Sequence, residues 1–233
     1  MNNKKFLKVI SKSIEIPKSE LSQFKGDRNK VHNKGWWHYG VITNLIRVNS
    51  SGNLQILVQK RSNIVDIAKV KYDQSLATQM LFSDQNKKRA FHRGIKEELN
   101  LNPTDIEFIE FLPQSNFYII KEYINENNIT NREKISLFVV KLKKEIVVET
   151  NCKRVTCIKW IDWNKFVDDI SNRPSNYTKT VRFFIKNVIL RNRLEKFMIN
   201  FLNGNSYKKL NSSKLNILYI SPKSNKDTIR NLQ

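Results

Sequence analysis

The sequence is poor in cysteine, with only Cys152 and Cys157 among its 233 residues. Their Cys-x₄-Cys spacing lacks the second Cys or His pair that a structural zinc site needs, and two thiols cannot form a disulfide framework. No run of about 20 apolar residues is present, and the lysine-containing residues 1–10 hold no sustained apolar stretch. We therefore expect reduced thiols, no transmembrane segment and a cytoplasmic location.

Acidic residues are also scarce: 21 Asp and Glu face 42 Lys and Arg, a net charge of +21. The excess of basic over acidic residues lies at the two ends of the chain. Residues 1–35 hold nine basic and three acidic groups, residues 36–172 hold 20 and 16, and residues 173–233 hold 13 and two. Such basic termini favour contact with a polyanion, so RNA or DNA is one expected partner. The alternative explanation is compositional: AT-rich coding sequences favour Lys, Asn and Ile, so surface lysines accumulate without a ligand.

One short segment combines charge with helical spacing. It runs Phe91-His-Arg-Gly-Ile-Lys-Glu-Glu-Leu-Asn-Leu101. Phe91, Ile95 and Leu99 recur every four residues and predict one apolar helix face, with Arg93 placed one turn before Glu97. The adjacent carboxylates of Glu97 and Glu98 repel each other unless a cation joins them, and Mg²⁺ suits that role. A solvated charged helix face is the simpler interpretation of these residues alone.

The segments around this helix follow a recognisable order. His32-Asn-Lys-Gly-Trp-Trp-His38 comes first, followed by a strand pair ending in Gln59-Lys-Arg-Ser62, then Tyr72-Asp-Gln-Ser75, and then the helix. Over roughly residues 30–190 this order resembles the Nudix superfamily, in particular the branch near isopentenyl-diphosphate isomerase. The resemblance implies an α/β Nudix fold, a mixed sheet between helices. It would divide the chain into an N-terminal extension (1–30), a Nudix-like domain (31–203) and a basic C-terminal tail (204–233).

The resemblance also implies a site. The family's box is G-x₅-E-x₇-R-E-U-x-E-E-x-G-U, where U is apolar, and its Arg falls on Arg93. By this match Glu97 and Glu98 would hold Mg²⁺ or Mn²⁺, and Arg93 would orient them. Glu133 would supply a further carboxylate from outside the box. Substrate contacts are expected from four more residues: Trp37, His38, Lys60 and Arg61.

The box is degenerate. Its first glycine falls on Gln79, or on Thr78 if one residue is inserted, and its first glutamate falls on Gln85, or on Asp84 with that insertion. The glutamate after the arginine is Gly94 and the late glycine is Asn100. A mid-helix glycine costs about 1 kcal/mol relative to alanine. Either close packing against a neighbour or drift in a degenerate box would explain Gly94.

These features leave several functions open. Isomerase chemistry is set aside, because those enzymes use a cysteine in the segment that corresponds to residues 73–80, which hold none. The leading hypothesis is a divergent hydrolase that cleaves a diphosphate linkage in a nucleotide-type substrate, slowly because Gly94 replaces a carboxylate. The alternative is a catalytically decayed module that binds nucleic acid or a protein partner through its basic termini. Hydrolysis of a capped or 5′-diphosphorylated RNA end ranks third, and the oligomeric state stays open.

Periodicity predicts the remaining elements. Residues 1–30 are expected to be polar and partly helical, with a helix start near Pro17, and Ser83 or Asp84 is the expected cap of the box helix. One long helix with a basic opposite face is expected from Val181 to Phe201, ending at Gly204. Strands are predicted at residues 39–48, 54–60, 106–111, 117–123, 135–142, 156–161 and 215–220.

Overall fold

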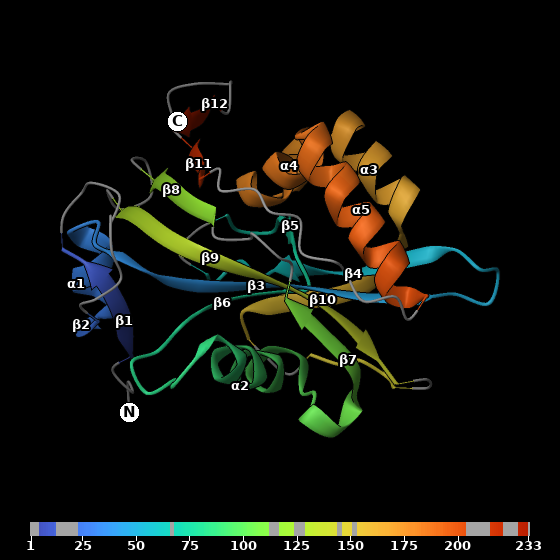
Figure 1. Ribbon diagram of the computed structural model, residues 1–233, viewed down its shortest axis with the longest axis horizontal. Coiled ribbons are helices and arrows are strands. Elements are labelled where there is room, and N and C mark those ends of the chain that lie inside the picture. Colours follow the sequence, from blue (N-terminus) through green and yellow to red (C-terminus); the bar gives the residue numbers. More distant parts are fainter. Residues whose placement is uncertain are drawn as a thin grey trace.

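The computed structural model describes residues 5–12, 23–65, 68–111, 117–123, 129–143, 146–150, 153–203, 215–220 and 228–232. The described strands form one sheet of mixed direction with the main order β10-β4-β3-β9-β8-β11-β12. Strands β1 and β6 also pair with β3. Strand β5 pairs with β4, β7 pairs with β9, and β2 pairs with β1. Helices cover both faces of this sheet (Figure 1).

The strands have the following bounds: β1 Phe6–Ser11, β2 Phe24–Asp27, β3 Trp37–Val48, β4 Leu54–Arg61, β5 Tyr72–Asp73, β6 Leu76–Gln79, β7 Ile106–Phe111, β8 Phe117–Tyr123, β9 Ile129–Leu142, β10 Val155–Asp162, β11 Leu215–Ile220 and β12 Thr228–Leu232. The helices are α1 Arg28–Asn33, α2 Lys87–Leu99, α3 Trp163–Asn172, α4 Lys179–Lys186 and α5 Val188–Leu202. Two 3₁₀ turns, Pro103–Asp105 and Pro174–Asn176, complete the described elements. Every predicted strand is confirmed, and β9 starts earlier than predicted, so that Glu133 lies within it.

Strand β3 lies inside the sheet, with strand neighbours on both edges and apolar side chains on both faces. Val41 and Leu45 pack against the α2 side of the sheet, whereas Ile42 and Ile46 pack against the side covered by α3, α4 and α5. This is the two-residue alternation of a strand buried on both sides. Strand β9 runs parallel to β3 and aligns His38 with Glu133.

The box helix α2 forms as its pattern predicts. Phe91, Ile95 and Leu99 are 0–1% exposed and lie in the core beneath the sheet. The predicted cap was wrong, however: the Asn86 side chain accepts a hydrogen bond from the Arg89 amide and caps the helix. The helix ends at Asn100, whose left-handed φ of 52° suits asparagine.

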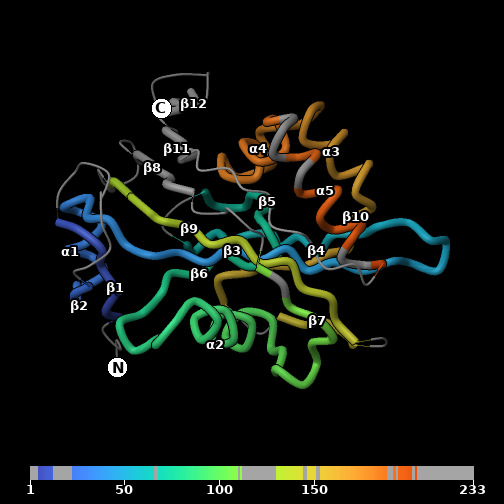
Figure 2. Tube along the Cα trace, in the orientation of Figure 1, coloured from blue at the N-terminus to red at the C-terminus, as the bar shows by residue number. Residues whose placement is uncertain are grey.

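The N-terminal segment differs from its prediction. Strands β1 and β2 form an antiparallel pair, β1 continues the main sheet through β3, and α1 follows directly with Asp27 as its N-cap. We call this the N-terminal unit (residues 5–12 and 23–36, which contain β1, β2 and α1). It lies at one end of the sheet (Figure 2), where Arg132 of β9 donates a hydrogen bond to the Gly35 carbonyl at 2.7 Å. The expected helix start near Pro17 lies outside the described residues.

The predicted long C-terminal helix is two helices. Helix α4 ends at Asn187, whose extended backbone (φ −76°, ψ 99°) breaks the helical path, and α5 begins at the next residue. Both still bury apolar side chains against the sheet: Val181, Phe184, Leu194, Phe197 and Met198. No helix in the described part of the chain is long and apolar enough to cross a membrane.

Candidate functional site

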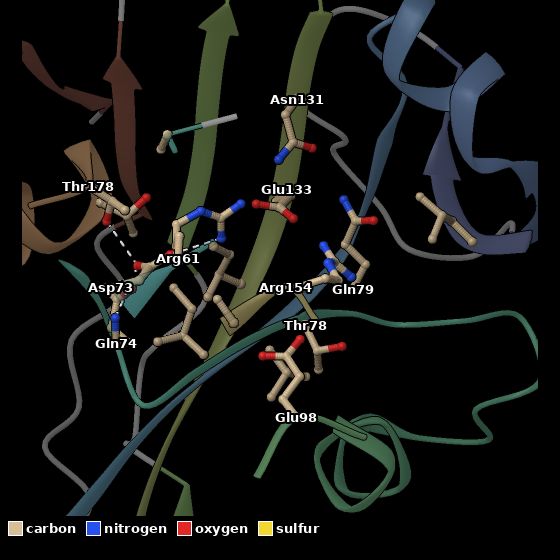
Figure 3. A pocket seen from close by; sticks show the side chains of 18 of the residues that line it. Arg61, Asp73, Gln74, Thr78, Gln79, Glu98, Asn131, Glu133, Arg154 and Thr178 are labelled. Carbon is tan, nitrogen blue, oxygen red and sulfur yellow. Dashed lines mark hydrogen bonds and ion pairs between the residues drawn. The ribbon is translucent and has the colours of Figure 1, made fainter. Parts of the chain in front are cut away.

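A cavity of about 390 Å³ opens where α2, β9, β3 and the start of α4 meet. Its walls carry eight cationic side chains and four carboxylates. The cations are Lys5, Arg28, Arg61, Lys71, Arg93, Arg154, Lys179 and Arg182, and the carboxylates are Asp73, Glu97, Glu98 and Glu133. In Figure 3, Arg61 and Arg154 reach into the space between Glu133 on β9 and Glu98 on α2. The lining is therefore suited to an anionic ligand with a few carboxylates at fixed places.

Arg93 is held in place by the loop before α2. Its guanidinium donates to both carboxylate oxygens of buried Asp84, with distances of 2.9 to 3.3 Å, and to the Gln79 carbonyl at 2.7 Å. Burial opposes the charge of Arg93, but hydrogen bonding and charge attraction from Asp84 outweigh it and raise the pKa of Arg93. Of the two residues that the sequence offered at this point, Asp84 and not Gln85 pairs with the arginine.

Glu97 faces the cavity mouth. Its carboxylate oxygen lies 3.3 Å from an Arg93 nitrogen and 3.4 Å from the Lys5 ammonium, and its side chain is 43% exposed. Arg93 therefore orients Glu97, and the N-terminal unit reaches the same carboxylate through Lys5.

Glu98 is a buried carboxylate of the site, with 8% of its surface exposed. Burial raises its pKa, while the nearby charges of Arg154 and Arg61 and a hydrogen bond from Gln59 oppose the rise. That hydrogen bond, from Gln59 Nε2, is long at 3.5 Å. A buried carboxylate with such weak hydrogen bonding favours a nearby cation.

Glu133 is buried on β9 beside a histidine pair. Gln79 Nε2 lies 2.8 Å from His32 Nε2 and 3.2 Å from His38 Nε2, and because an amide nitrogen donates, both ring nitrogens accept. His38 then donates from Nδ1 to the Trp36 carbonyl at 3.0 Å. His38 Nε2 also lies 3.7 Å from a Glu133 oxygen, so His38 packs against this carboxylate.

Gly94 is a packing requirement in this chain. A Cβ placed there would lie 2.8 Å from Thr78 Cγ2, 3.2 Å from Thr78 Cβ and 3.0 Å from Leu76 Cδ2. Contacts under 3.0 Å require a shift, and the obstructing Thr78 methyl belongs to a stiff β-branched side chain on a strand. Thr78 thus occupies the space that a side chain at position 94 would need. Close packing, rather than drift alone, explains Gly94.

A second set of polar contacts joins the sheet to α4. Asp73 accepts from the Thr178 hydroxyl at 2.9 Å, from the Gln74 amide at 3.0 Å and from Arg61 at 3.3 Å. Thr178 also caps α4. This network fixes the Arg61 side chain beside the cavity and places Lys179 and Arg182, which follow Thr178 in the chain, on the cavity wall.

Five of the eight predicted site residues line this one cavity: Arg61, Arg93, Glu97, Glu98 and Glu133. The other three do not. Trp37 is fully buried in the core beside α2, and His38 is 0% exposed behind Glu133. Lys60 points its ammonium towards the Tyr72 ring, 5.8 Å from the ring centroid, because neighbouring residues of a strand face opposite sides.

Sequence reasoning missed several cavity residues: Lys5, Arg28, Lys71, Asp73, Arg154, Thr178, Lys179 and Arg182. Asp73 had a signal, since it belongs to the Tyr72–Ser75 segment that carries the family resemblance. The lysines and arginines had none, because they are scattered along a chain with many cations. Cys157 is a free, exposed thiol away from the cavity, and Cys152 lies outside the described residues.

No protein-family model matches the chain, and no curated protein sequence matches it. Solved structures match in fold. The crystal structure of DR0079 from Deinococcus radiodurans aligns with a TM-score of 0.53 at 14% identity, covering 78% of this chain and 98% of the other. RenU, a Nudix hydrolase from M. smegmatis, aligns at 0.48 and 10% identity over 89% and 98% of the two chains. A C. elegans Ap4A hydrolase aligns at 0.45 and 13% identity over 70% and 98%.

At these identities the likeness concerns the fold alone. The structure has a mixed sheet between α2 on one face and α3 to α5 on the other, and it shares its fold with the Deinococcus structure, so the predicted fold class, α/β with a mixed sheet between helices, is confirmed. The substrate, the metal and the roles of individual residues remain proposals.

Proposed function

We propose that this chain is a Nudix-type hydrolase that binds a nucleotide-type diphosphate in the cavity and cleaves its diphosphate linkage with the help of Mg²⁺ or Mn²⁺. The observation that carries this proposal is the joint lining of one cavity by guanidinium groups and buried carboxylates. Phosphate oxygens pair well with arginine, and a divalent cation joins phosphate to carboxylate. The cavity volume of about 390 Å³ is within the range of small-molecule sites.

The donor chemistry fits the metal. Mg²⁺ takes one or two carboxylates and completes its octahedron with water and substrate phosphate. Glu98 is a buried, weakly hydrogen-bonded carboxylate on α2, and Glu133 is a second buried carboxylate on β9. Among the residues that the structure describes, no three His, Cys, Asp or Glu side chains form a group that could hold a metal. The ion would therefore bind together with a substrate phosphate and water, and Glu98, Glu133 and the more exposed Glu97 are the carboxylates that the proposal assigns to it.

The chain's own residues have distinct parts in this proposal. Arg61 and Arg154 bind and orient the phosphates, because their guanidinium groups reach into the cavity between the two carboxylate walls. Arg93 is a positioning residue: Asp84 and the Gln79 carbonyl fix it, and it orients Glu97. The bound divalent ion would supply charge neutralisation of the phosphates and lower the pKa of a bound water.

Slow turnover is expected because position 94 has no carboxylate. Losing one carboxylate from a metal or base position can remove several kcal/mol of transition-state stabilisation. Substrate screening should therefore use high enzyme concentrations and long incubation.

The test is metal binding followed by hydrolysis, on wild type and on Glu97→Gln, Glu98→Gln and Glu133→Gln. Calorimetry with Mn²⁺ and a nonhydrolysable dinucleotide should show binding that Glu98→Gln abolishes. Hydrolysis of dinucleoside polyphosphates should fall about 100-fold or more in Glu98→Gln. Glu107→Gln is the matched control, since Glu107 is exposed on β7 and pairs with Lys141. If Glu98→Gln leaves a verified activity unchanged, the assignment is wrong.

A second candidate function is binding without catalysis. The observation that favours it is the packing of Thr78 into the space beside Gly94, which closes the position where the family carries a glutamate. It predicts that Glu97→Gln and Glu98→Gln leave ligand affinity intact and that no diphosphate in the screen is cleaved. Metal-dependent cleavage that needs Glu98 would exclude it.

A further inference from the structure

The outer surface of the N-terminal unit is strongly basic. Its described residues, 5–12 and 23–36, hold seven lysines and arginines and a single acidic residue. That acid, Asp27, accepts from the Lys30 amide as the cap of α1. The lysines Lys12, Lys25, Lys30 and Lys34 are exposed. This concentration exceeds what a uniformly lysine-rich composition would place on one small unit.

Aromatic rings lie beneath these lysines. The Lys25 ammonium lies 4.1 Å from the centroid of the Phe6 ring, and the Lys12 ammonium lies 4.9 Å from that of Phe24 and 5.3 Å from that of Trp36. The three rings are half-buried, and Phe24 meets Trp36 edge to face at 6.2 Å. Since exposed ammonium groups lie over the ring faces, those faces are at the surface. Ring faces between cations are the recurring surface for single-stranded nucleic acid.

The same unit forms part of the cavity wall. Lys5, Arg28 and His32 line the cavity, and Arg28 donates to Gln79 at 3.1 Å. Cations therefore occur both on the cavity wall, at Lys5 and Arg28, and on the rest of the same unit, whose strands lie beside the starts of β3 and β9 (Figure 2). A ligand with a phosphate in the cavity would have its next charged groups directed along this unit.

We propose that the N-terminal unit binds the strand of a single-stranded nucleic acid whose terminal phosphates occupy the cavity. The inference rests on the proposed function, because it extends the ligand of the same cavity. A single strand fits better than a duplex, whose base faces are stacked inside. An acidic membrane fits less well, because the exposed large apolar side chains of the described residues lie outside this unit.

The experiment measures two kinds of ligand, oligonucleotides and a mononucleotide, on the same proteins. One is a 12-nucleotide RNA with a 5′ diphosphate and a 3′ fluorophore, together with its DNA counterpart, and the other is ADP. The variant Lys12→Gln/Lys25→Gln/Lys30→Gln should bind the oligonucleotide at least about tenfold more weakly. Its slope of log affinity against log salt should be smaller by about 2, since each phosphate contact to a single strand contributes about 0.7. ADP affinity should be unchanged in this variant.

Two controls make the result specific. Lys143→Gln/Lys165→Gln/Lys196→Gln removes the same charge from exposed lysines elsewhere on the chain and should leave oligonucleotide binding at the wild-type level. Arg154→Gln, in the cavity, should weaken ADP and oligonucleotide alike.

The outcomes separate the two proposals. The inference is overturned if the first triple variant binds the oligonucleotide as tightly as wild type does, or if both triple variants lose the same affinity. In either case, ADP binding to wild type would still support the cavity as a nucleotide site. Absence of ADP binding to wild type would instead overturn the proposed function. Binding to vesicles with 30% phosphatidylserine that the first triple variant abolishes, with no oligonucleotide binding, would assign the surface to membranes and overturn the inference.

Discussion

At the scale of single residues, Gly94 and Thr78 provide the sharpest prediction. Gly94→Ala should lower the free energy of unfolding by about 1–2 kcal/mol, because overpacking against Thr78 exceeds the gain of about 1 kcal/mol in helix propensity. Urea denaturation measures this change. In an exposed helix position the same substitution would be stabilising.

The control for this prediction is the double variant. Thr78→Ala removes the methyl group that lies 2.8 Å from the added Cβ. In that background Gly94→Ala should be neutral or stabilising, with a coupling free energy of at least about 0.5 kcal/mol. Additive effects of the two substitutions would show that the close approach is relieved elsewhere.

The Asp84–Arg93 pair leads to a second prediction. Both side chains are largely buried, at 7% and 19% exposure. Asp84→Asn should therefore cost about 3 kcal/mol of unfolding free energy, since it leaves a buried charge without its main partner. Glu97→Gln, which removes the exposed partner of the same arginine, should cost less than about 1 kcal/mol. Similar losses in the two variants, measured by urea denaturation, would contradict this ranking.

Residue roles were only partly predictable from the sequence. The match of Arg93 to the family box was sufficient to place Glu97 and Glu98 beside one cavity. Only the structure shows that Asp84, and not Gln85, pairs with Arg93, since one inserted residue in a loop does not change any periodic pattern of the sequence. The reciprocal fit of Thr78 and Gly94 was also hidden, because it joins a strand and a helix across the core.

At the scale of elements, α2 begins with an unfavourable charge pattern. Its first turn contains Lys87, Lys88 and Arg89 and no acidic residue, although a helix N-terminus favours negative charge. Burial, and then the charges of Lys88 and Arg89, lower the pKa of His92 in the next turn below 6.5.

This shift predicts a pH effect on stability. As pH falls through 6.5, His92 takes up a proton in the unfolded chain before it does so in the folded one, so the unfolding free energy decreases. His92→Gln should therefore show a shallower loss of thermal stability between pH 7 and pH 5 than wild type, measured in matched ionic strength. A slope equal to that of wild type would contradict the lowered pKa. Both proteins retain His32 and His38, so the contributions of these histidines to the pH dependence of stability cancel in the comparison.

Elements with strong periodicity were predictable, and those defined by partners were not. The apolar stripe of α2 and the alternation in β3 each specify an element from local sequence. The break at Asn187 was missed because apolar spacing continues through it, and polar Asn alone does not end a helix. Strands β1 and β2 were missed because each is short and becomes a strand by pairing, β1 with both β2 and β3.

At the scale of the whole molecule, charge repulsion should limit stability at low salt. With a net charge of +21, the folded chain concentrates like charge, and screening by salt should relieve it. The melting temperature should rise between 10 mM and 200 mM NaCl at pH 7. A melting temperature that is constant or falls over this range would show that local ion pairs, such as Arg93 with Asp84, outweigh the general repulsion.

The cavity could not have been predicted as a whole. These cavity cations come from separate places: Lys5 precedes β1, Arg61 ends β4, Arg154 lies in the turn before β10 and Arg182 lies in α4. Nothing in their local sequence distinguishes them from the other cations of the chain. Only the topology brings them together, because β3 is flanked by β4, β9 and β1 and so gathers distant segments at one place.

The contact between Thr78 and Gly94 also fixes an order in which the two positions can change. A side chain at 94 meets an obstruction as long as Thr78 keeps its methyl group, whereas a smaller residue at 78 only opens space. Any route to a side chain at position 94, in evolution or in the laboratory, therefore passes through position 78 first. A library of single substitutions tests each side chain at position 94 only against the intact Thr78 methyl group.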